Sequence, residues 1–514
     1  MRPVLTTSDL RVWDQLTIKD QSISSFQLME RAANAFCTLY MSLFKHPEQV
    51  TCILAGPGNN GGDGFAISRL LVRAGLKAIY IYEDSESTSN LEVNDRNKNR
   101  RLLQNMQEVN WIQSTEELIQ IYKTNTIYTI DAVFGTGLNR VINPNWEAIF
   151  SIVNKYSHKT ISVDIPSGLN SDQEQLHKEA AAIISADHTF TFQTYKRAMT
   201  FPETGIFCDR IHVLDIGLSK RFIPETHRNM FLLDHSIWQY IGRSNTFDHK
   251  GSNGKTLHYC GSQKMPGAGV LCSRAAHRCG AGYVISLVPE VNVDMMISRH
   301  PELLLIPYNE SDGFSMNQII SENEGISSIL AGPGLSTSEL VRKSIVQLLE
   351  MRLDIPLVLD ADALNVLNGR SEALSTWPGP LVITPHVKEF DRLFGESHSW
   401  FERENKMRKL SESLQICIVL KGAFTRISFG DGTLFINTSG NPGLAKAGSG
   451  DVLSGILSGH LARYKDFKAA VLSAVYLHGK AADDLTAHVS EKSILATDLI
   501  EQLGKSIKLL ESNE

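Results

Sequence analysis

Cysteine is scarce in this sequence and offers no pattern for cross-linking. The 514 residues include 7 cysteines, which are scattered, odd in number and without CxxC pairs. A disulfide framework needs paired cysteines, and a structural zinc site needs closely spaced ones. The sequence therefore predicts reduced thiols and a cytoplasmic protein.

Long apolar runs and an excess of basic residues are missing as well. No stretch approaches the roughly 20 apolar residues of a membrane-spanning helix. The first residues, MRPVLTTSDLRVWDQLTI, lack the apolar core and cleavage site of a secretory signal. The formal net charge of −6 does not favour a nucleic-acid-binding face. We therefore expect small-molecule ligands, with neither a membrane nor a nucleic acid as partner.

Two successive series of strand and helix patterns are present instead. With 42% hydrophobic and 21% charged residues, the composition is ordinary for a globular protein with substantial cores. Strands that alternate with helices indicate a parallel sheet covered on both faces. We predict an α/β protein of two domains, residues 1–225 with a Rossmann-like doubly wound sheet and residues 226–514. The predicted strands are TCILAGPG, AIYIY, IYTIDAVFG, TISVDIPSG and TFTF, then KTLHYCG, GYVISLV, SSILAGPG, PLVLDADA, GPLVITPH, ICIVLKGA and TRISFGDGTLFI.

The hexapeptide ILAGPG occurs twice, at 53–58 and at 329–334. In each copy an apolar run ends in two glycines around a proline, and glycine permits backbone angles and close approaches that a Cβ forbids. A loop after a parallel strand is a common ligand site, although each copy alone is more simply a strand-to-turn joint. The two halves do not otherwise repeat their glycine signatures in the same order. We therefore assign the copies to two different domains, not to a duplication.

The first copy continues into a glycine-rich loop, GPGNNGGDG (56–64), that precedes a predicted helix. Its N–H groups can face an anion at the helix N-terminus. Asn59, Asn60 and Asp63 add groups suited to a polar ligand or a hard cation. Two further strand ends carry Asp131 and Asp164. Because the carboxyl ends of parallel strands meet at one edge, these motifs predict one pocket; the alternative is that each aspartate only caps a turn.

The motifs GPGNNGGDG, DAVFGTGL and VDIPSGLN, in this order, resemble the YjeF N-terminal domain of the NAD(P)H-hydrate epimerase family. The similarity spans about residues 1–220 and implies interconversion of the R and S forms of hydrated NAD(P)H, with potassium in the site. It implies that Asn60, Asp131 and Ser167 bind potassium. Asp164 is the expected acid/base, because inversion at the hydrated carbon needs proton transfer, and Lys196 is a candidate contact to an anionic ligand. The expected dinucleotide contacts are Asn59, Asn60, Gly61, Gly62, Asp63, Gly135, Thr136, Gly137, Leu138 and Asp164.

The most specific pattern is NPGLAKAGSGDVLSGIL (441–457). Glycines directly before Asp451 and a following helix can hold a transferring phosphoryl group on backbone N–H groups. Asp451 can then accept a proton from the attacking hydroxyl; the alternative is a first-turn acid that only stabilises the helix. Lys421, at a strand end in VLKGAFT, suits a nucleotide phosphate. LDADALNVL and TPHVKEF add Asp360, Asp362 and His386 at two more strand ends.

Together HKGSNGK, MPGAG, AGPGLS, LDADALNVL, TPHVKEF, VLKGAFT and NPGLAKAGSGD resemble the YjeF C-terminal family, the ADP- or ATP-dependent NAD(P)H-hydrate dehydratases. The similarity spans about residues 235–505 and implies a ribokinase-like fold, magnesium with the nucleotide, and Asp451 as the catalytic base. One departure is Ala447, where family members often have a glycine. The residues expected at the hydrate are Ala268, Gly334, His386 and Asp451, and those at the nucleotide are Lys421, Gly422, Ala423, Phe424, Thr425 and Gly450.

The two resemblances imply a bifunctional enzyme, an isomerase and a lyase, that repairs hydrated NADH and NADPH. The lyase would phosphorylate the hydrate's hydroxyl, with ADP as the expected donor and ATP as the alternative, and phosphate elimination would restore the nicotinamide. One alternative is a small-molecule kinase of the ribokinase superfamily with an N-terminal ligand-binding module; the N-terminal motifs and His386 argue against it. Another is a non-catalytic binding protein, against which Asp164 and Asp451 argue. A homo-oligomer is expected.

Overall fold

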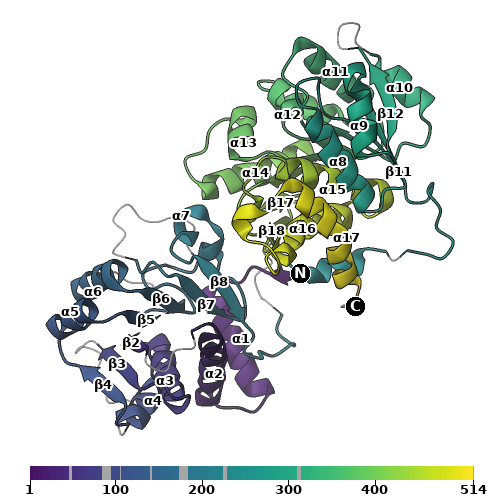
Figure 1. The fold of residues 1–514 in the computed structure, drawn as a ribbon. Coiled ribbons are helices and arrows are strands. Elements are labelled where there is room, and N and C mark those ends of the chain that lie inside the picture. The colour runs from purple at the N-terminus through teal and green to yellow at the C-terminus, as the bar shows by residue number, and fades with distance from the viewer. Residues whose placement is uncertain are drawn as a thin grey trace. The chain divides into compact units, whose positions relative to one another are not determined.

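The computed structural model describes residues 1–512 except 45–48, 84–93, 105, 139–141, 173–182, 224–228, 243 and 310–313. The chain divides into two compact units, one of Val4–Arg228 and one of Asn229–Glu514 together with Met1–Pro3. Each unit is an α/β structure built on one sheet (Figure 1). The predicted boundary, between residues 225 and 226, lies outside the described residues.

The sheet of the Val4–Arg228 unit is parallel throughout its described strands, in the order β4-β3-β2-β5-β6-β7-β8. The central strand β2 lies between β3 and β5, so the strand order reverses there, and this switch point is where open α/β sheets bind ligands. The strands are β2 (Val50–Ala55), β3 (Ala78–Glu83), β4 (Val109–Ile112), β5 (Ile127–Ala132), β6 (Lys159–Val163), β7 (His188–Phe192) and β8 (Arg210–Leu214). The helices are α1 (Thr7–Asp20), α2 (Ser25–Leu43), α3 (Asn59–Arg73), α4 (Asp95–Gln104), α5 (Thr115–Thr124), α6 (Pro144–Tyr156) and α7 (Pro202–Gly205).

Strand β2 contributes side chains to two separate cores. Ile53 and Ala55 pack in a cluster with residues of α2, α3 and α4. Cys52 and Leu54 pack in another with residues of α5 and α6. Successive side chains of a strand point to opposite faces, so the sheet is covered on both sides, as Figure 1 shows for α5 and α6 against α2 to α4. The predicted doubly wound α/β fold of this half is confirmed.

The other unit has a larger, mixed sheet in the order β1-β9-β18-β17-β16-β15-β14-β13-β10-β11-β12. The strands from β12 to β16 are parallel, whereas β17 is antiparallel to both its neighbours. Strand β10 lies between β11 and β13, which places a second switch point there. The strands are β1 (Arg2–Pro3), β9 (Met230–Leu233), β10 (Lys255–Tyr259), β11 (Tyr283–Pro289), β12 (Leu304–Tyr308), β13 (Ser328–Ala331), β14 (Leu357–Leu359), β15 (Leu381–Ile383), β16 (Cys417–Leu420), β17 (Arg426–Ser428) and β18 (Leu434–Asn437).

Helix α15 is the buried centre of this unit. Its residues from Val452 to Leu461 are all buried, and the helix packs against α8, α16 and α17. A helix that is buried on every side belongs to the core of its domain, so the Asp451 end of α15 has a rigid support. The helices are α8 (Pro266–Arg278), α9 (Val293–Arg299), α10 (Met316–Glu322), α11 (Glu339–Glu350), α12 (Asp362–Val366), α13 (Val387–Phe394), α14 (Trp400–Leu414), α15 (Ser449–Arg463), α16 (Phe467–Leu485) and α17 (Ala496–Ser512).

All seven cysteines are free thiols with buried side chains. Within the described part of the chain, no helix combines the length and the apolar character needed to cross a membrane.

Candidate active sites

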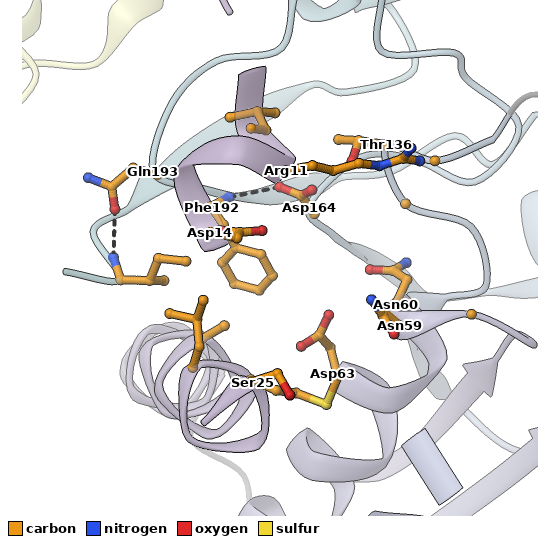
Figure 2. Close-up of a pocket in the computed structure, with 18 of the residues that line it drawn as sticks. Arg11, Asp14, Ser25, Asn59, Asn60, Asp63, Thr136, Asp164, Phe192 and Gln193 are labelled. Carbon is orange, nitrogen blue, oxygen red and sulfur yellow. Dashed lines mark hydrogen bonds between the residues drawn. The ribbon is translucent and has the colours of Figure 1, made fainter. Parts of the chain in front are cut away.

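A cavity of about 590 Å³ lies at the carboxyl ends of the parallel strands in the Val4–Arg228 unit (Figure 2). The loops after β2, β5, β6 and β7 and the helices α1, α2 and α3 form its walls. The structure thus brings the three sequence motifs to one place. The predicted residues that line the cavity are Asn59, Asn60, Asp63, Gly135, Thr136, Gly137, Leu138, Asp164 and Lys196.

Gly61 and Gly62, which we expected to contact the dinucleotide, do not line this cavity. A Cβ on Gly61 would lie 2.0 Å from the Gly56 carbonyl oxygen, and one on Gly62 would lie 2.8 Å from the Met29 methyl group. Both glycines therefore let the start of α3 approach neighbouring segments closely. Packing accounts for these glycines without a ligand.

Gly56 provides a test of how the two loops at the switch point are held together. A Cβ at this position would lie 1.9 Å from the Val133 carbonyl oxygen, after β5, whereas one on Gly58 meets nothing within 4 Å. We expect Gly56→Ala to lower the free energy of unfolding by about 3 kcal/mol, as overpacking a rigid site does. The matched Gly58→Ala change should alter it by less than about 1 kcal/mol. Urea unfolding of the two variants makes the comparison, and equal stabilities would contradict the close contact.

Asp164 is held by one of its carboxylate oxygens. Its backbone has a φ of 68°, and its N–H donates to the Phe190 carbonyl at 2.8 Å. Within the described chain, Oδ2 has no hydrogen-bond partner. This arrangement fixes the carboxylate and leaves one oxygen free for a ligand in the cavity. The donors to Oδ1 are Lys196 Nζ at 2.5 Å, Phe192 N at 2.9 Å and Thr191 Oγ1 at 3.3 Å.

Two more carboxyl groups, those of Asp14 and Asp63, enter the same cavity (Figure 2). Burial raises the pKa of Asp14 to about 6, and the charge of Asp164 adds to the effect. Burial, with the charges of Asp164 and Asp14, raises the pKa of Asp63 well above its usual range. With Asp95, the described residues that line the cavity include four acids, together with the Lys196 ammonium and the Arg11 guanidinium. Asp14 was not predicted from the sequence, because α1 carries no recognisable motif.

The predicted potassium ligands Asp131 and Ser167 are in direct contact. Ser167 donates from N to Asp131 Oδ2 at 2.8 Å and from Oγ to Oδ1 at 2.5 Å, and Ser162 Oγ donates to Oδ2 at 2.7 Å. Burial raises the pKa of Asp131, and these hydrogen bonds offset part of that effect. Asn60 is buried beside Gly135, and its Nδ2 atom has no partner among the described residues. Within the described part of the chain, no hydrogen bond joins Asn60 to Asp131 or Ser167.

In the other unit, Lys421 stands at the centre of a cluster of acids. Its Nζ atom lies 2.8 Å from Asp360 Oδ1 and 4.0 Å from Glu389 Oε2. Burial alone would lower the Lys421 pKa, but the charges of Asp360 and Glu389 outweigh it and the pKa is raised. A Cβ on Gly450 would lie 3.6 Å from Nζ. The predicted nucleotide residues Lys421 and Gly450 are thus neighbours, although their motifs are far apart in the sequence.

Asp451 lies in the first turn of α15, after Gly448 with a φ of 90°. Burial raises its pKa to about 6; the charge of Asp360 adds to this, and Lys421 opposes it. Asp360 is itself fixed, because its Oδ2 accepts a 2.7 Å hydrogen bond from Ser454 Oγ of the same helix. Since a general base works best with a pKa near the working pH, Asp451 is suited to accept a proton.

The four residues expected at the hydrate fall into two groups. Gly334, with a φ of 67°, is so close to Ala268 that a Cβ on it would lie 2.7 Å from the Ala268 Cβ. His386 caps α13, where its Nδ1 accepts the Glu389 N–H at 3.1 Å. Glu389 is also the acid near Lys421, so His386 adjoins the acids around Lys421.

Of the other predicted nucleotide residues, Gly422 and Ala423 are exposed and Phe424 and Thr425 are half-buried in the β16–β17 loop.

Known families match both units. The family of the YjeF-related protein N-terminus matches residues 25–198, and that of the NAD(P)H-hydrate dehydratase matches residues 258–505. The bifunctional NAD(P)H-hydrate repair enzyme Nnr of Moorella thermoacetica is 31% identical over 527 residues, which cover 99% of this chain and 97% of that protein. The chain belongs to the family of bifunctional NAD(P)H-hydrate repair enzymes. The two resemblances noted in the sequence are confirmed.

Solved structures match the C-terminal part of the chain. A ribokinase-like superfamily protein from Enterococcus faecalis is 26% identical, with a TM-score of 0.50, and covers 56% of this chain and 99% of its own. The predicted ribokinase-like fold is confirmed by this match. An ADP/ATP-dependent NAD(P)H-hydrate dehydratase from Bacillus subtilis, co-crystallised with ATP and Mg²⁺, is 32% identical, covers 55% of this chain and 98% of its own, and has a TM-score of 0.48.

Proposed function

We propose that residues 1–225 interconvert the R and S epimers of hydrated NAD(P)H and that residues 226–514 dehydrate the S epimer at the expense of ADP. The proposal rests on one observation: in each unit, an acid from one of the sequence motifs is held in a defined position. Asp164 follows β6, and Asp451 lies in the first turn of α15. Asp164 has one free oxygen in a cavity. Asp451 has a pKa of about 6 at the start of a buried helix.

In the epimerase, Asp164 is the base. Inversion at the hydrated carbon needs a proton to leave the hydroxyl group, and the free Oδ2 is the acceptor, while Lys196 holds Oδ1. The loop from Gly135 to Leu138 and the residues Asn59, Asn60 and Asp63 line the cavity that would take the dinucleotide. The ion pair between Lys196 and Oδ1 fixes the direction in which Oδ2 of Asp164 points. Holding a reacting group in the right orientation is what a preorganised site does.

In the dehydratase, Asp451 takes the proton of the hydrate's hydroxyl group, whose oxygen then attacks the terminal phosphoryl group of the nucleotide. Backbone N–H groups at the start of α15 hold the phosphoryl oxygens, and Lys421 to Thr425 with Gly450 hold the nucleotide. Loss of phosphate together with a neighbouring ring proton then re-forms the double bond. Phosphorylation is needed because hydroxide is a poor leaving group.

Magnesium fits the acids beside Asp451. The charges of Asp360 and Asp362 both raise the pKa of Asp451, whereas the Lys421 ammonium lowers it, so negative charge is in excess around Asp451. Magnesium is usually held by one or two carboxylates together with nucleotide phosphates. When bound, it would neutralise phosphate charge, and Asp360 and Asp362 are the residues that would hold it.

Potassium fits the site of Asn60, Asp131 and Ser167. The Nδ2 atom of the buried Asn60 amide has no hydrogen-bond partner among the described residues. A 180° flip of the amide group places its oxygen at the same position. Together with a carboxylate and a hydroxyl group, it offers oxygen ligands suited to a hard cation. The ion would supply positive charge that ties together the start of α3, the end of β5 and the loop after β6.

We therefore expect potassium to raise the melting temperature of the protein by about 2–4 °C more than sodium does, because a ligand of the native state alone adds stability. The comparison is made at equal ionic strength, since general screening would otherwise imitate a specific ion. Asp131→Asn should cancel the difference and impair epimerisation while dehydration of the pure S epimer continues. Identical melting curves of the unmutated protein in the two salts would rule out the potassium site.

One assay tests the proposed function as a whole. The protein is given a mixture of both epimers of hydrated NADPH with magnesium and ADP, or ATP in a second arm, and recovery of NADPH absorbance is followed. Complete recovery supports both activities. Recovery that stops at the S fraction contradicts the epimerase, and nucleotide consumption with no NADPH supports the alternative of a small-molecule kinase.

A further inference from the structure

Helix α1 forms a wall of the epimerase cavity, although it precedes the residues 25–198 that the family match covers. Leu10, Asp14 and Ile18 line the cavity at intervals of four residues. Side chains at this spacing share one face of a helix. One face of α1 is therefore part of the site, and it carries one acid, Asp14.

Asp14 differs from the other acids of its helix in having no structural partner. Asp9 caps the helix through Thr6, and Asp20 binds Ser219 Oγ and Arg221. For Asp14, no hydrogen bond or ion pair is found within the described chain. A half-buried carboxyl group without partners is costly to fold. Its position facing the cavity indicates a group kept for a ligand (Figure 2).

Several charged groups face Asp14 from the elements around the cavity. Asp164 and Lys196, from the loops after β6 and β7, act on it most directly, and Asp63 of α3 also interacts with it. Burial raises the pKa of Asp14 to about 6. Asp164, in contrast, accepts a hydrogen bond from the Lys196 ammonium. Two acids with opposed environments in one site are the usual arrangement of an acid and a base. The other charged residues that line the cavity are Arg11 and Asp95.

We propose that Asp14 is a second catalytic residue of the epimerase and acts as the proton donor that works with the base Asp164, an inference that rests on the proposed function. Oδ2 of Asp164 removes the hydroxyl proton, and the O–H electron pair forms a carbonyl group. The bond from that carbon to the ring nitrogen breaks, and the nitrogen keeps the electron pair and takes the proton of Asp14. Rotation of the open carbonyl arm and reversal of each step close the ring as the other epimer and return both protons.

The test is the rate of epimerisation by full-length Asp14→Asn protein. We expect kcat to fall by about 100-fold or more, the range lost with a general acid, while KM changes by less than about threefold. Because a donor must be protonated, kcat/KM of the unmutated enzyme should decrease above pH about 6, and this decrease should vanish in the variant. Asp14→Glu, which keeps the acid, should be at least about tenfold faster than Asp14→Asn.

The control variant is Lys19→Gln, on the exposed side of the same helix, which changes the charge by one unit and should leave the rate unchanged. Asp14→Asn should melt no lower than the unmutated protein at pH 8, because it removes a charge that burial disfavours. A rate within threefold of normal in Asp14→Asn, an unchanged pH profile, or a loss confined to KM overturns the role of Asp14. Absence of epimerisation in the unmutated protein would instead refute the proposed function.

Discussion

Asp451→Asn is expected to lower the rate of dehydration by about 10³-fold and to leave epimerisation unchanged. Asparagine keeps the size of the side chain and its place in the first turn of α15 but cannot accept the hydroxyl proton, and loss of a general base has an effect of this order. The measurement is NADPH recovery from the pure S epimer with saturating nucleotide, alongside epimerisation by the same protein.

The pH dependence of dehydration follows from the same group. Asp451 acts as a base only when ionised, and its pKa is about 6. We therefore expect kcat/KM to fall about tenfold for each pH unit below 6 and this dependence to disappear in Asp451→Asn. The control is Asp354→Asn, at an exposed acid of the same unit. A variant that keeps more than about a tenth of the normal rate would remove Asp451 from the chemistry.

Stability should change in the opposite direction to activity. A carboxyl group whose pKa is raised in the folded state favours its protonated form, so it weakens folding once the pH rises through that pKa. For Asp451 the pKa goes from 3.8 to about 6, and at 1.36 kcal/mol per unit this amounts to at most about 3 kcal/mol. Asp451→Asn should therefore be more stable than the unmutated protein at pH 8. Functional acids commonly reduce stability in this way.

The sequence predicts the central strands and most of the site because their signals are local. A buried parallel strand is a short apolar run, and a glycine-rich loop at its end marks the switch-point edge. ILAGPG illustrates both what such local signals predict, which is the end of a strand, and what they do not predict, which is the place of that strand in its sheet. Its first copy ends the central strand β2, and its second ends β13, which lies beside the strand β10 that begins the parallel series. The copies hold different places in two topologies, which supports two domains over a duplication.

What the sequence did not reveal depends on packing between distant segments. The edge strand β12 was not predicted, since it contains Pro307, and a proline is tolerated only where no neighbour needs its N–H. Strand β9 has four residues and is held between β1 and β18. Asp14 belongs to the site because α1 folds across the strand ends, and no local pattern in TSDLRVWDQL shows that. The environment of Glu389, beside both His386 and Lys421, likewise exists only in the fold.

Asp164→Asn is expected to lower epimerisation by about 10²- to 10⁴-fold, the range for loss of a general base. Asparagine is the suitable replacement, because among non-glycine residues it tolerates the left-handed backbone with a φ of 68° well. Its oxygen can still accept from Phe192 N, but it carries no charge. Dehydration of the pure S epimer, which depends on Asp451, should continue at the normal rate.

The loss of epimerisation in Asp164→Asn has to be distinguished from a loss of folding. Asp164 is the ion-pair partner of Lys196, whose side chain is 2% exposed. Removing one member of a buried pair costs about 3–5 kcal/mol, whereas removing both is often neutral. Asp164→Asn combined with Lys196→Met should therefore recover most of the stability of the unmutated protein and none of its epimerisation. If epimerisation returns together with stability in the double variant, the carboxylate serves the fold, and the base of the reaction has to be sought among the other acids of the cavity.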